Sequence, residues 1–274
     1  MARAPRLLAV TGGHRVDMAD FTAMLDAVCT ERGWVWAHAT QPEAQRWLRE
    51  AHAGQWDAVL LHDIPGLRLA RGRAPEPHGP SADEAAALVG LLRAGQGLVV
   101  THHALAAWPA WDAWANVVGG RYLYAPGELR GVELPASGYR MAVHHVNVLA
   151  PAHPVCAGVE PFEVDDELYL CPVHEAEVEP LLATTASMDP ELFIDTLRAV
   201  QDGHEHACPP GPPGSHLVGW AKAALNSPVV YLQPGHGPET MRHPMYRRLL
   251  GNAVEWVASA AAHEWARANS VEVE

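Results

Sequence analysis

Two adjacent histidines, His102 and His103, end an apolar run at residues 97–101. The run reads Gly-Leu-Val-Val-Thr and is typical of a buried strand. In α/β proteins, ligands bind at the carboxyl ends of strands, so these imidazoles lie where a site is expected. An imidazole can transfer protons near neutral pH and can bind a metal ion. The pair therefore predicts the centre of a catalytic site.

Other histidines and acids follow or interrupt predicted strands. His14 follows a glycine turn after the first predicted strand, and His236 lies in a Pro-Gly-His-Gly turn after the last. Asp166 and Glu167 interrupt the apolar segment 162–170, which favours buried or cleft-facing acids over a solvated edge. The predicted catalytic residues are His102, His103, Asp166, Glu167 and His236.

Alternating strands and helices must position these residues. The sequence predicts strands at 6–11, 34–39, 56–61 and 97–101, and helices at about 20–33, 40–52 and 81–95. This alternation predicts a parallel sheet with helices on both faces, and right-handed crossovers place all the strand ends on one edge. The expected fold class is α/β, a flavodoxin-like, three-layer, doubly wound and mostly parallel sheet.

The second half adds strands and loops to this sheet. A Gly/Pro-rich loop at 64–80 lies at the edge of the strand ends and is a candidate lid. A similar segment at 189–215 carries His204, Glu205, His206 and Cys208, but a flexible loop is a poor preorganised metal site, so we interpret it as a lid or surface loop. No long linker divides the chain, which favours a single domain over 1–274. Further strands are predicted at 139–149, 162–170, 178–184, 217–220 and 228–233, before a helix at 245–262.

Composition limits the partners. The 274-residue chain has a formal net charge of -13, which would repel a phosphate backbone and argues against general nucleic-acid binding. Its longest apolar runs are strand-sized, so we expect no membrane span or signal peptide, no membrane binding and a cytoplasmic location. The four cysteines form no C-x-x-C pair, so neither a zinc knuckle nor a disulfide framework is expected. A small molecule is the expected partner, and homo-oligomerisation stays open.

Several motifs follow one another in a fixed order along the chain. They are Gly-Leu-Val-Val-Thr-His-His-Ala at 97–104, Trp111, Val-Gly-Gly-Arg at 118–121, His-Pro-Val at 153–155, the segment 162–169 with Asp-Glu-Leu-Tyr, and Tyr-Leu-Gln-Pro-Gly-His at 231–236. Together they resemble the motifs of the ThuA-like (trehalose utilisation) family, and the resemblance runs from about residue 6 to 258. It implies a fold like that of the class I glutamine amidotransferases and a link to sugar metabolism, with a small-molecule sugar as substrate.

The resemblance also shows a departure from amidotransferase chemistry. His102 occupies the strand-to-helix turn where an amidotransferase carries its cysteine, and an imidazole cannot form the glutamyl thioester. Glutaminase activity is therefore not expected, although the fold is. His236 resembles the catalytic histidine of that fold in its place after the last strand.

Two kinds of site are compatible with these residues. Two or three imidazoles and a carboxylate can bind a divalent metal such as zinc and leave a position for water or a sugar oxygen, with His14, His103 and His236 as candidate ligands. Without a metal, Asp166 or Glu167 and a histidine can exchange protons with a sugar. His14, Trp108 and Tyr169 are the candidate substrate-binding residues.

Some of these residues also have ordinary structural interpretations. His144 and His145 on one strand are expected to be one buried and one exposed residue rather than ligands. Trp108, Trp111 and Trp114 recur at three-residue steps, which indicates a packing stripe on a helix. His14 is as well explained by hydrogen bonds within its glycine turn.

Two functions are compatible with these residues. The first is a sugar-metabolism enzyme, such as a hydrolase or isomerase, that acts on a sugar or a (keto-)disaccharide derivative by His/carboxylate acid–base chemistry, with or without a metal. The second is a non-catalytic carbohydrate-binding or regulatory module on an amidotransferase-like fold. Replacement of His102 and Glu167 distinguishes them, because only the first predicts loss of turnover with binding retained.

Overall fold

The computed structural model describes residues 3–70 and 72–273, and in them one large sheet passes through the molecule. Two short hairpins lie outside this sheet, β4 (Leu67–Arg68) with β5 (Glu76–Pro77) and β7 (Gly127–Leu129) with β8 (Val132–Leu134). The strands of the large sheet are β1 (Arg6–Gly12), β2 (Val35–Thr40), β3 (Ala58–Asp63), β6 (Leu98–Thr101), β9 (Gly138–Val148), β10 (Phe162–Leu170), β11 (Glu179–Thr184), β12 (Ile194–Asp195), β13 (Leu217–Ala224) and β14 (Ser227–Leu232).

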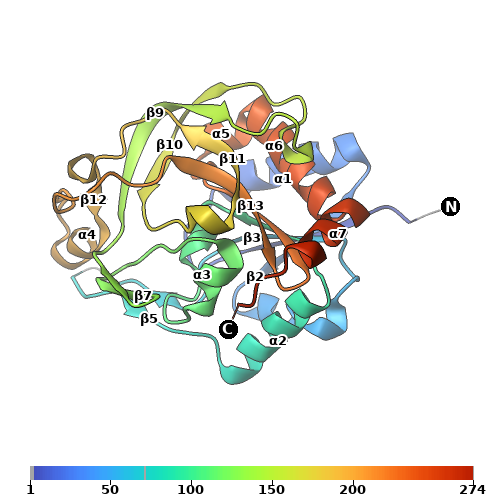
Figure 1. Ribbon diagram of the computed structural model, residues 1–274, viewed down its shortest axis with the longest axis horizontal. Helices are drawn as coiled ribbons and strands as arrows, with labels where there is room; N and C mark the ends of the chain where they lie inside the picture. Colours follow the sequence, from blue (N-terminus) through green and yellow to red (C-terminus); the bar gives the residue numbers. More distant parts are fainter. Residues whose placement is uncertain (1–2, 71, 274) are drawn as a thin grey trace.

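The order of the strands confirms the flavodoxin-like fold. One half of the sheet is parallel, in the order β2-β1-β3-β6-β14, which is the 2-1-3-4-5 order of doubly wound proteins. From β14 the sheet continues through β13, β11, β9 and β10, and each of these pairings is antiparallel. The strands expected in the second half of the sequence therefore extend the parallel sheet instead of forming a second one (Figure 1).

Helices cover both faces of the parallel strands. Along β1, Leu7 and Ala9 pack in one core cluster with α1 and α6, and Leu8 and Val10 pack in the other with α2 and α3. Because both faces are covered, residues 7–10 are all buried and the strand is apolar without a break. The helices are α1 (Met18–Arg32), α2 (Ala82–Arg93), α3 (Ala113–Val118), α4 (Thr196–Asp202), α5 (Pro238–Arg242), α6 (Pro244–Val257) and α7 (Ala260–Ala268) (Figure 1).

Three predicted helices differ from the structure. Thr40 was expected to cap a helix to about residue 52, but it stays in β2 opposite Thr11, and only two 3-10 turns follow, at Glu43–Arg46 and Glu50–His52. The helix at 245–262 divides because the Ser259 hydroxyl accepts from the Ala262 N–H and caps α7. The tryptophan stripe is not one helix, since a 3-10 helix at His102–Ala106 and an irregular segment precede α3.

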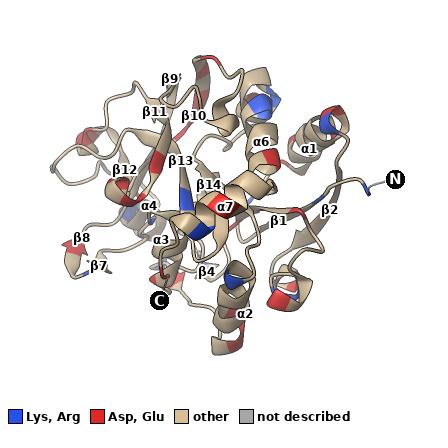
Figure 2. Ribbon diagram, turned by 45° about the vertical axis from the view of Figure 1, so that its right-hand side comes forward, with Lys and Arg blue, Asp and Glu red and all other residues tan. Residues whose placement is uncertain are grey.

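Charge is spread over the elements rather than concentrated. In the view of Figure 2, Asp and Glu residues occur on α1, α2 and α7, and Lys and Arg are scattered among them. None of the helices in 3–70 and 72–273 is both long and apolar enough to cross a membrane.

Candidate functional site

The backbone at the end of β6 turns sharply at His102. This residue has a φ of 49°, in the left-handed region, and its side chain is buried. The His102 Nδ1–H donates to the Gln233 carbonyl at 2.7 Å, and the Tyr231 hydroxyl donates to the backbone carbonyl of His102 at 3.0 Å. A non-glycine residue in this conformation costs on the order of 1 kcal/mol and is typical of functional sites. These contacts fix the ring so that Nε2 faces Glu167, Tyr169 and His236.

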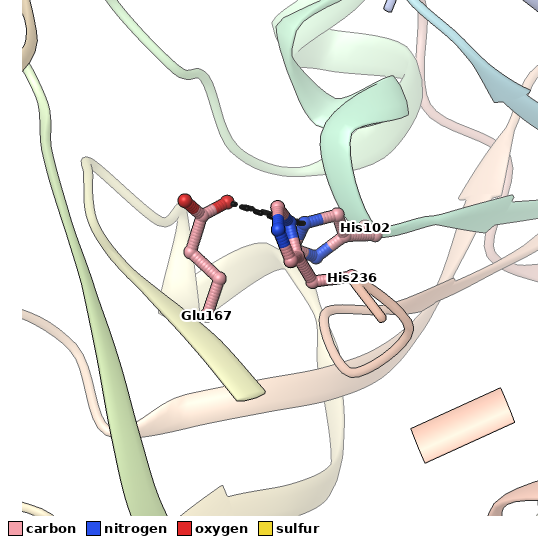
Figure 3. A group of neighbouring side chains, drawn as sticks. All are labelled: His102, Glu167 and His236. Carbon is pink, nitrogen blue, oxygen red and sulfur yellow. Dashed lines mark hydrogen bonds and ion pairs between the residues drawn. The ribbon is translucent and has the colours of Figure 1, made fainter. Parts of the chain in front are cut away.

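Three side chains from separate parts of the chain meet at that nitrogen. His102 Nε2 lies 3.0 Å from His236 Nδ1 and 3.2 Å from Glu167 Oε2, and Glu167 Oε2 lies 3.3 Å from His236 Nδ1. Glu167 comes from β10 and His236 from the turn after β14 (Figure 3). The Tyr169 hydroxyl is 2.8 Å from His102 Nε2.

Glu167 and His236 shift each other's pKa toward the charged forms. Burial acts to raise the pKa of Glu167, but the hydrogen bonds and charges of His102 and His236 outweigh it and hold this pKa well below its usual range. The hydrogen bond to Glu167 raises the pKa of His236. The carboxylate is therefore ionised at neutral pH, and it favours a proton on His236, which is one-third exposed.

Asp166, also predicted as catalytic, lies behind the cluster. Its Oδ2 accepts from the Gly235 N–H at 2.7 Å, and its Oδ1 accepts from the N–H groups of His236 at 3.0 Å and Glu167 at 2.9 Å. The side chain is buried. Its hydrogen bonds therefore connect β10 to the turn that carries His236, and Glu167 is the acid that faces the imidazoles.

Gly235 allows that turn to pack closely. Its φ is +133°, and an added Cβ would lie 2.5 Å from the Tyr246 hydroxyl. Gly235→Ala is expected to lower the free energy of unfolding by about 2 kcal/mol through backbone strain and this clash. Gly237→Ala in the same turn is the control, because no atom lies within 4 Å of its added Cβ. Urea unfolding measures both, and equal losses would contradict the packing argument.

A pocket of about 270 Å³ opens beside the cluster. Residues from both predicted lid segments line it, Ile64 and Leu69 from the first and Thr196 and Val200 from the second. The two segments also meet, since the Gly72 N–H donates to the Val200 carbonyl at 3.3 Å. The other lining residues are His14, His103, Ala106, Tyr122, Tyr124, Tyr139, Glu167 and Tyr169.

His14 and His103 form another part of the pocket wall. Their rings lie 4.7 Å apart, and His103 also contacts the ring of the buried His62 at 4.3 Å. His103 Nε2–H donates to the His62 carbonyl at 3.3 Å, while its Nδ1 has no partner among the described residues. Burial lowers the pKa of His14 and, more strongly, of His103, so His103 is a neutral acceptor.

The grouping of the predicted metal ligands differs from the sequence-based set. In the residues that the structure describes, the His/Cys/Asp/Glu group with ligand atoms mutually within 4.8 Å is His102, Glu167 and His236. His14 and His103 are outside this group. Trp108, a candidate for substrate binding, lines a neighbouring cavity and not the site pocket. His144 is buried and His145 exposed, as expected.

Sequence reasoning missed Tyr122, Tyr124 and Tyr139, which line the pocket, and Gln233, which orients His102. Gln233 directly precedes the Pro-Gly-His-Gly turn, so its position was a usable signal. Tyr122 and Tyr124 follow the Gly-Gly-Arg motif in an irregular segment with no periodic pattern. Their place in the pocket depends on how that segment folds back.

Asp63 adds a titrating group at the end of β3. It is buried and accepts from Gln41 Nε2, and burial raises its pKa to about 7. In the unfolded chain the carboxyl titrates near pH 4, so the folded state keeps a proton that the unfolded state has lost, and stability falls as pH rises from about 4 to 7. Asp63→Asn is expected to raise the free energy of unfolding at pH 8 by on the order of 2 kcal/mol. Urea unfolding at pH 5 and pH 8 tests this, and no gain at pH 8 would contradict it.

Comparison with known proteins agrees with the resemblance seen in the sequence. The family model for ThuA, described as trehalose utilisation, matches residues 6–257. A ThuA-like protein from Parabacteroides merdae has the same fold at 15% identity and a TM-score of 0.63, covering 94% of this chain and 91% of that one. A ThuA-like protein from Bacteroides uniformis has the same fold at 18% identity and a TM-score of 0.62, covering 94% of this chain and 93% of that one. No curated protein matches. The chain therefore belongs to the ThuA family, which indicates a role in sugar metabolism.

Proposed function

We propose that the chain is an enzyme of sugar metabolism that acts on a sugar ring by acid–base chemistry. The observation that carries the proposal is the meeting of His102, Glu167 and His236 beside a tyrosine-lined pocket of about 270 Å³. This volume is below the range of roughly 300–1,000 Å³ that holds drug-sized ligands, so one sugar ring suits it. Aromatic faces with hydroxyl groups suit the apolar and polar sides of such a ring.

Each residue of the site has a separate role in the proposed chemistry. His236 carries a proton that the Glu167 carboxylate stabilises, and its partial exposure lets it deliver that proton to a sugar oxygen. Glu167 offsets the positive charge of His236. His103 lines the other side of the pocket. His102, fixed by Gln233, sets the position of the other two groups.

The same three ligand atoms fit a divalent cation such as zinc. Two imidazole nitrogens and a carboxylate oxygen are a common ligand set, and His102 donates its other ring N–H to a backbone carbonyl, as metal-binding histidines do. Bound there, the ion would polarise a sugar oxygen or a water molecule. It would take the place of the proton on His236.

The site does not support glutaminase chemistry. Such chemistry needs a thiolate, and His102 occupies the turn. Cys171 is buried, and burial raises its pKa to about 12. Burial likewise raises the pKa of Cys29, Cys156 and Cys208, in each case to about 11.

Turnover of trehalose or a related sugar tests the proposal. The protein is incubated with trehalose and with methyl α-glucoside in D₂O, and proton NMR follows new products and exchange of ring hydrogens. The wild type is expected to change one of the sugars, and His236→Ala is expected to lose this activity. His145→Ala is the control, because His145 also pairs with a glutamate, Glu163, but at an exposed position. Equal activity of all three proteins would contradict the assignment.

Competition between metal and proton gives a second test. Zn²⁺ is expected to bind the cluster in titration calorimetry, with an affinity that falls from pH 8 to pH 6, because His236 cannot hold a proton and a metal at one nitrogen. Glu167→Gln is expected to weaken binding by about a hundredfold, and Glu163→Gln to leave it unchanged. The same affinity in both variants would show that Zn²⁺ binds elsewhere.

A further inference from the structure

A second cavity, of about 400 Å³, lies beside the site pocket. It is at the carboxyl-end side of β1, β2 and β3, where sheets of this strand order bind ligands. Ile64 lines both cavities, and the glycine turn contributes Gly13 to one and His14 to the other. A ligand longer than one ring could therefore reach both cavities along this turn.

A chain of side-chain amides forms one wall of the second cavity. Gln45 Nε2 donates to Gln41 Oε1 at 3.0 Å, and Gln41 Nε2 donates to Asp63 Oδ2 at 2.7 Å. Asp63 is buried, and its bond fixes which way both amides face. Each amide nitrogen carries a second hydrogen, and Gln45 also has its Oε1 as an acceptor. This pattern of adjacent donors and acceptors matches neighbouring hydroxyl groups on a sugar ring.

Trp108 forms another wall, and several contacts hold it there. Its φ is 48°, a strained value for a tryptophan, and its N–H donates to the Pro65 carbonyl at 2.8 Å. Its carbonyl accepts from the guanidinium of Arg121, a residue that is only 1% exposed. A Cβ at Gly66 would lie 2.8 Å from the indole ring, so glycine makes room for it. The fold therefore uses a strained residue and a buried cation to keep a half-buried indole at the cavity.

We propose that this cavity is a subsite for a second, uncharged sugar ring of a two-ring ligand whose first ring lies against Glu167. The inference rests on the proposed function and adds the size and chemistry of its substrate. The Trp108 face packs on the apolar side of the ring, and Gln41 and Gln45 bind its hydroxyls. Arg68 and Glu84, of opposite charge, both line the cavity, which favours a neutral ligand over an anion.

Calorimetry with two sugars tests the subsite on the full chain. Methyl α-glucoside supplies one ring and trehalose supplies two. Trehalose is expected to bind the wild type about tenfold more tightly. Gln45→Ala and Trp108→Phe are expected to bring trehalose to within about threefold of methyl α-glucoside and to leave the affinity for methyl α-glucoside unchanged. Gln45 is half-buried at the surface, so its variant is expected to fold.

The control is Trp36→Phe, since Trp36 is also half-buried but lines neither cavity and is expected to change neither affinity. If both subsite variants keep the wild-type ratio of affinities, the second cavity is not a ring subsite, while the proposed function stands. If the wild type binds neither sugar, the subsite and the sugar specificity of the proposed function are both overturned.

Discussion

Glu167→Gln is expected to lower kcat by about a thousandfold with little change in the affinity for sugar. Glutamine has the shape of glutamate but no charge, so it cannot stabilise a proton on His236. The hydrogen bond that His236 donates to Glu167 is the main reason for the raised pKa of His236. Without it, burial lowers the pKa of His236, so the imidazolium that donates the proton is disfavoured. Steady-state kinetics with the sugar that NMR identifies, together with calorimetric binding, measures both quantities.

Glu163→Gln is the matched control for this variant. Glu163 lies on the same strand and also pairs with a histidine, His145, at 3.2 Å, but both side chains are more than half exposed. Its replacement is expected to change neither kcat nor binding. A non-catalytic module would give a different result: the wild type would bind sugar without turnover, and Glu167→Gln would weaken binding alone. That outcome would contradict the proposal of an enzyme and support a non-catalytic carbohydrate-binding module.

Asp166→Asn is expected to lower both stability and turnover. The buried carboxylate accepts three backbone N–H groups, from Gly235, His236 and Glu167. An asparagine amide has one accepting oxygen, so at least one N–H loses its partner and the other carboxylate position becomes a donor. We expect the free energy of unfolding to fall by about 3 kcal/mol. We also expect kcat to fall by about a hundredfold, because the turn no longer holds His236 against Glu167.

Asp166 is expected to act by positioning His236 rather than by touching the sugar, and kinetic constants of the Asp166→Asn variant distinguish these two roles. KM for the sugar is expected to change little, because Asp166 does not line the pocket. Asp165→Asn is the control, since the neighbouring side chain is exposed and is expected to affect neither stability nor kcat. A loss of stability with unchanged kcat at a temperature where the variant is folded would show a purely structural role.

Much of the fold follows from local sequence patterns. The apolar runs 7–10, 58–61 and 98–100 of β1, β3 and β6 are buried, and such runs are readable because an unpaired polar side chain buried there would cost free energy. Helix caps were less reliable. Ser81 forms the predicted capping box with Glu84, but Thr40 does not cap a helix because its backbone pairs in β2. A residue in a capping motif can cap a helix or pair in a strand, and the local sequence does not show which of the two forms.

For the site, the sequence by itself determined that an imidazole stands at the β6 turn and that acids interrupt β10. It also placed His236 in the turn after the last strand of the parallel sheet. Strand ends on one edge follow from the handedness of crossovers, so these residues could be expected near one another.

Only the tertiary structure decided which of these residues touch. The antiparallel strands that extend the sheet bring β10 alongside the β14 turn, so that Glu167 faces His102 and His236 while Asp166 binds the backbone behind them. Successive side chains on a strand point to opposite faces, so two adjacent acids take different roles. Which acid faces the site depends on strand register, and register is fixed by packing across the whole sheet.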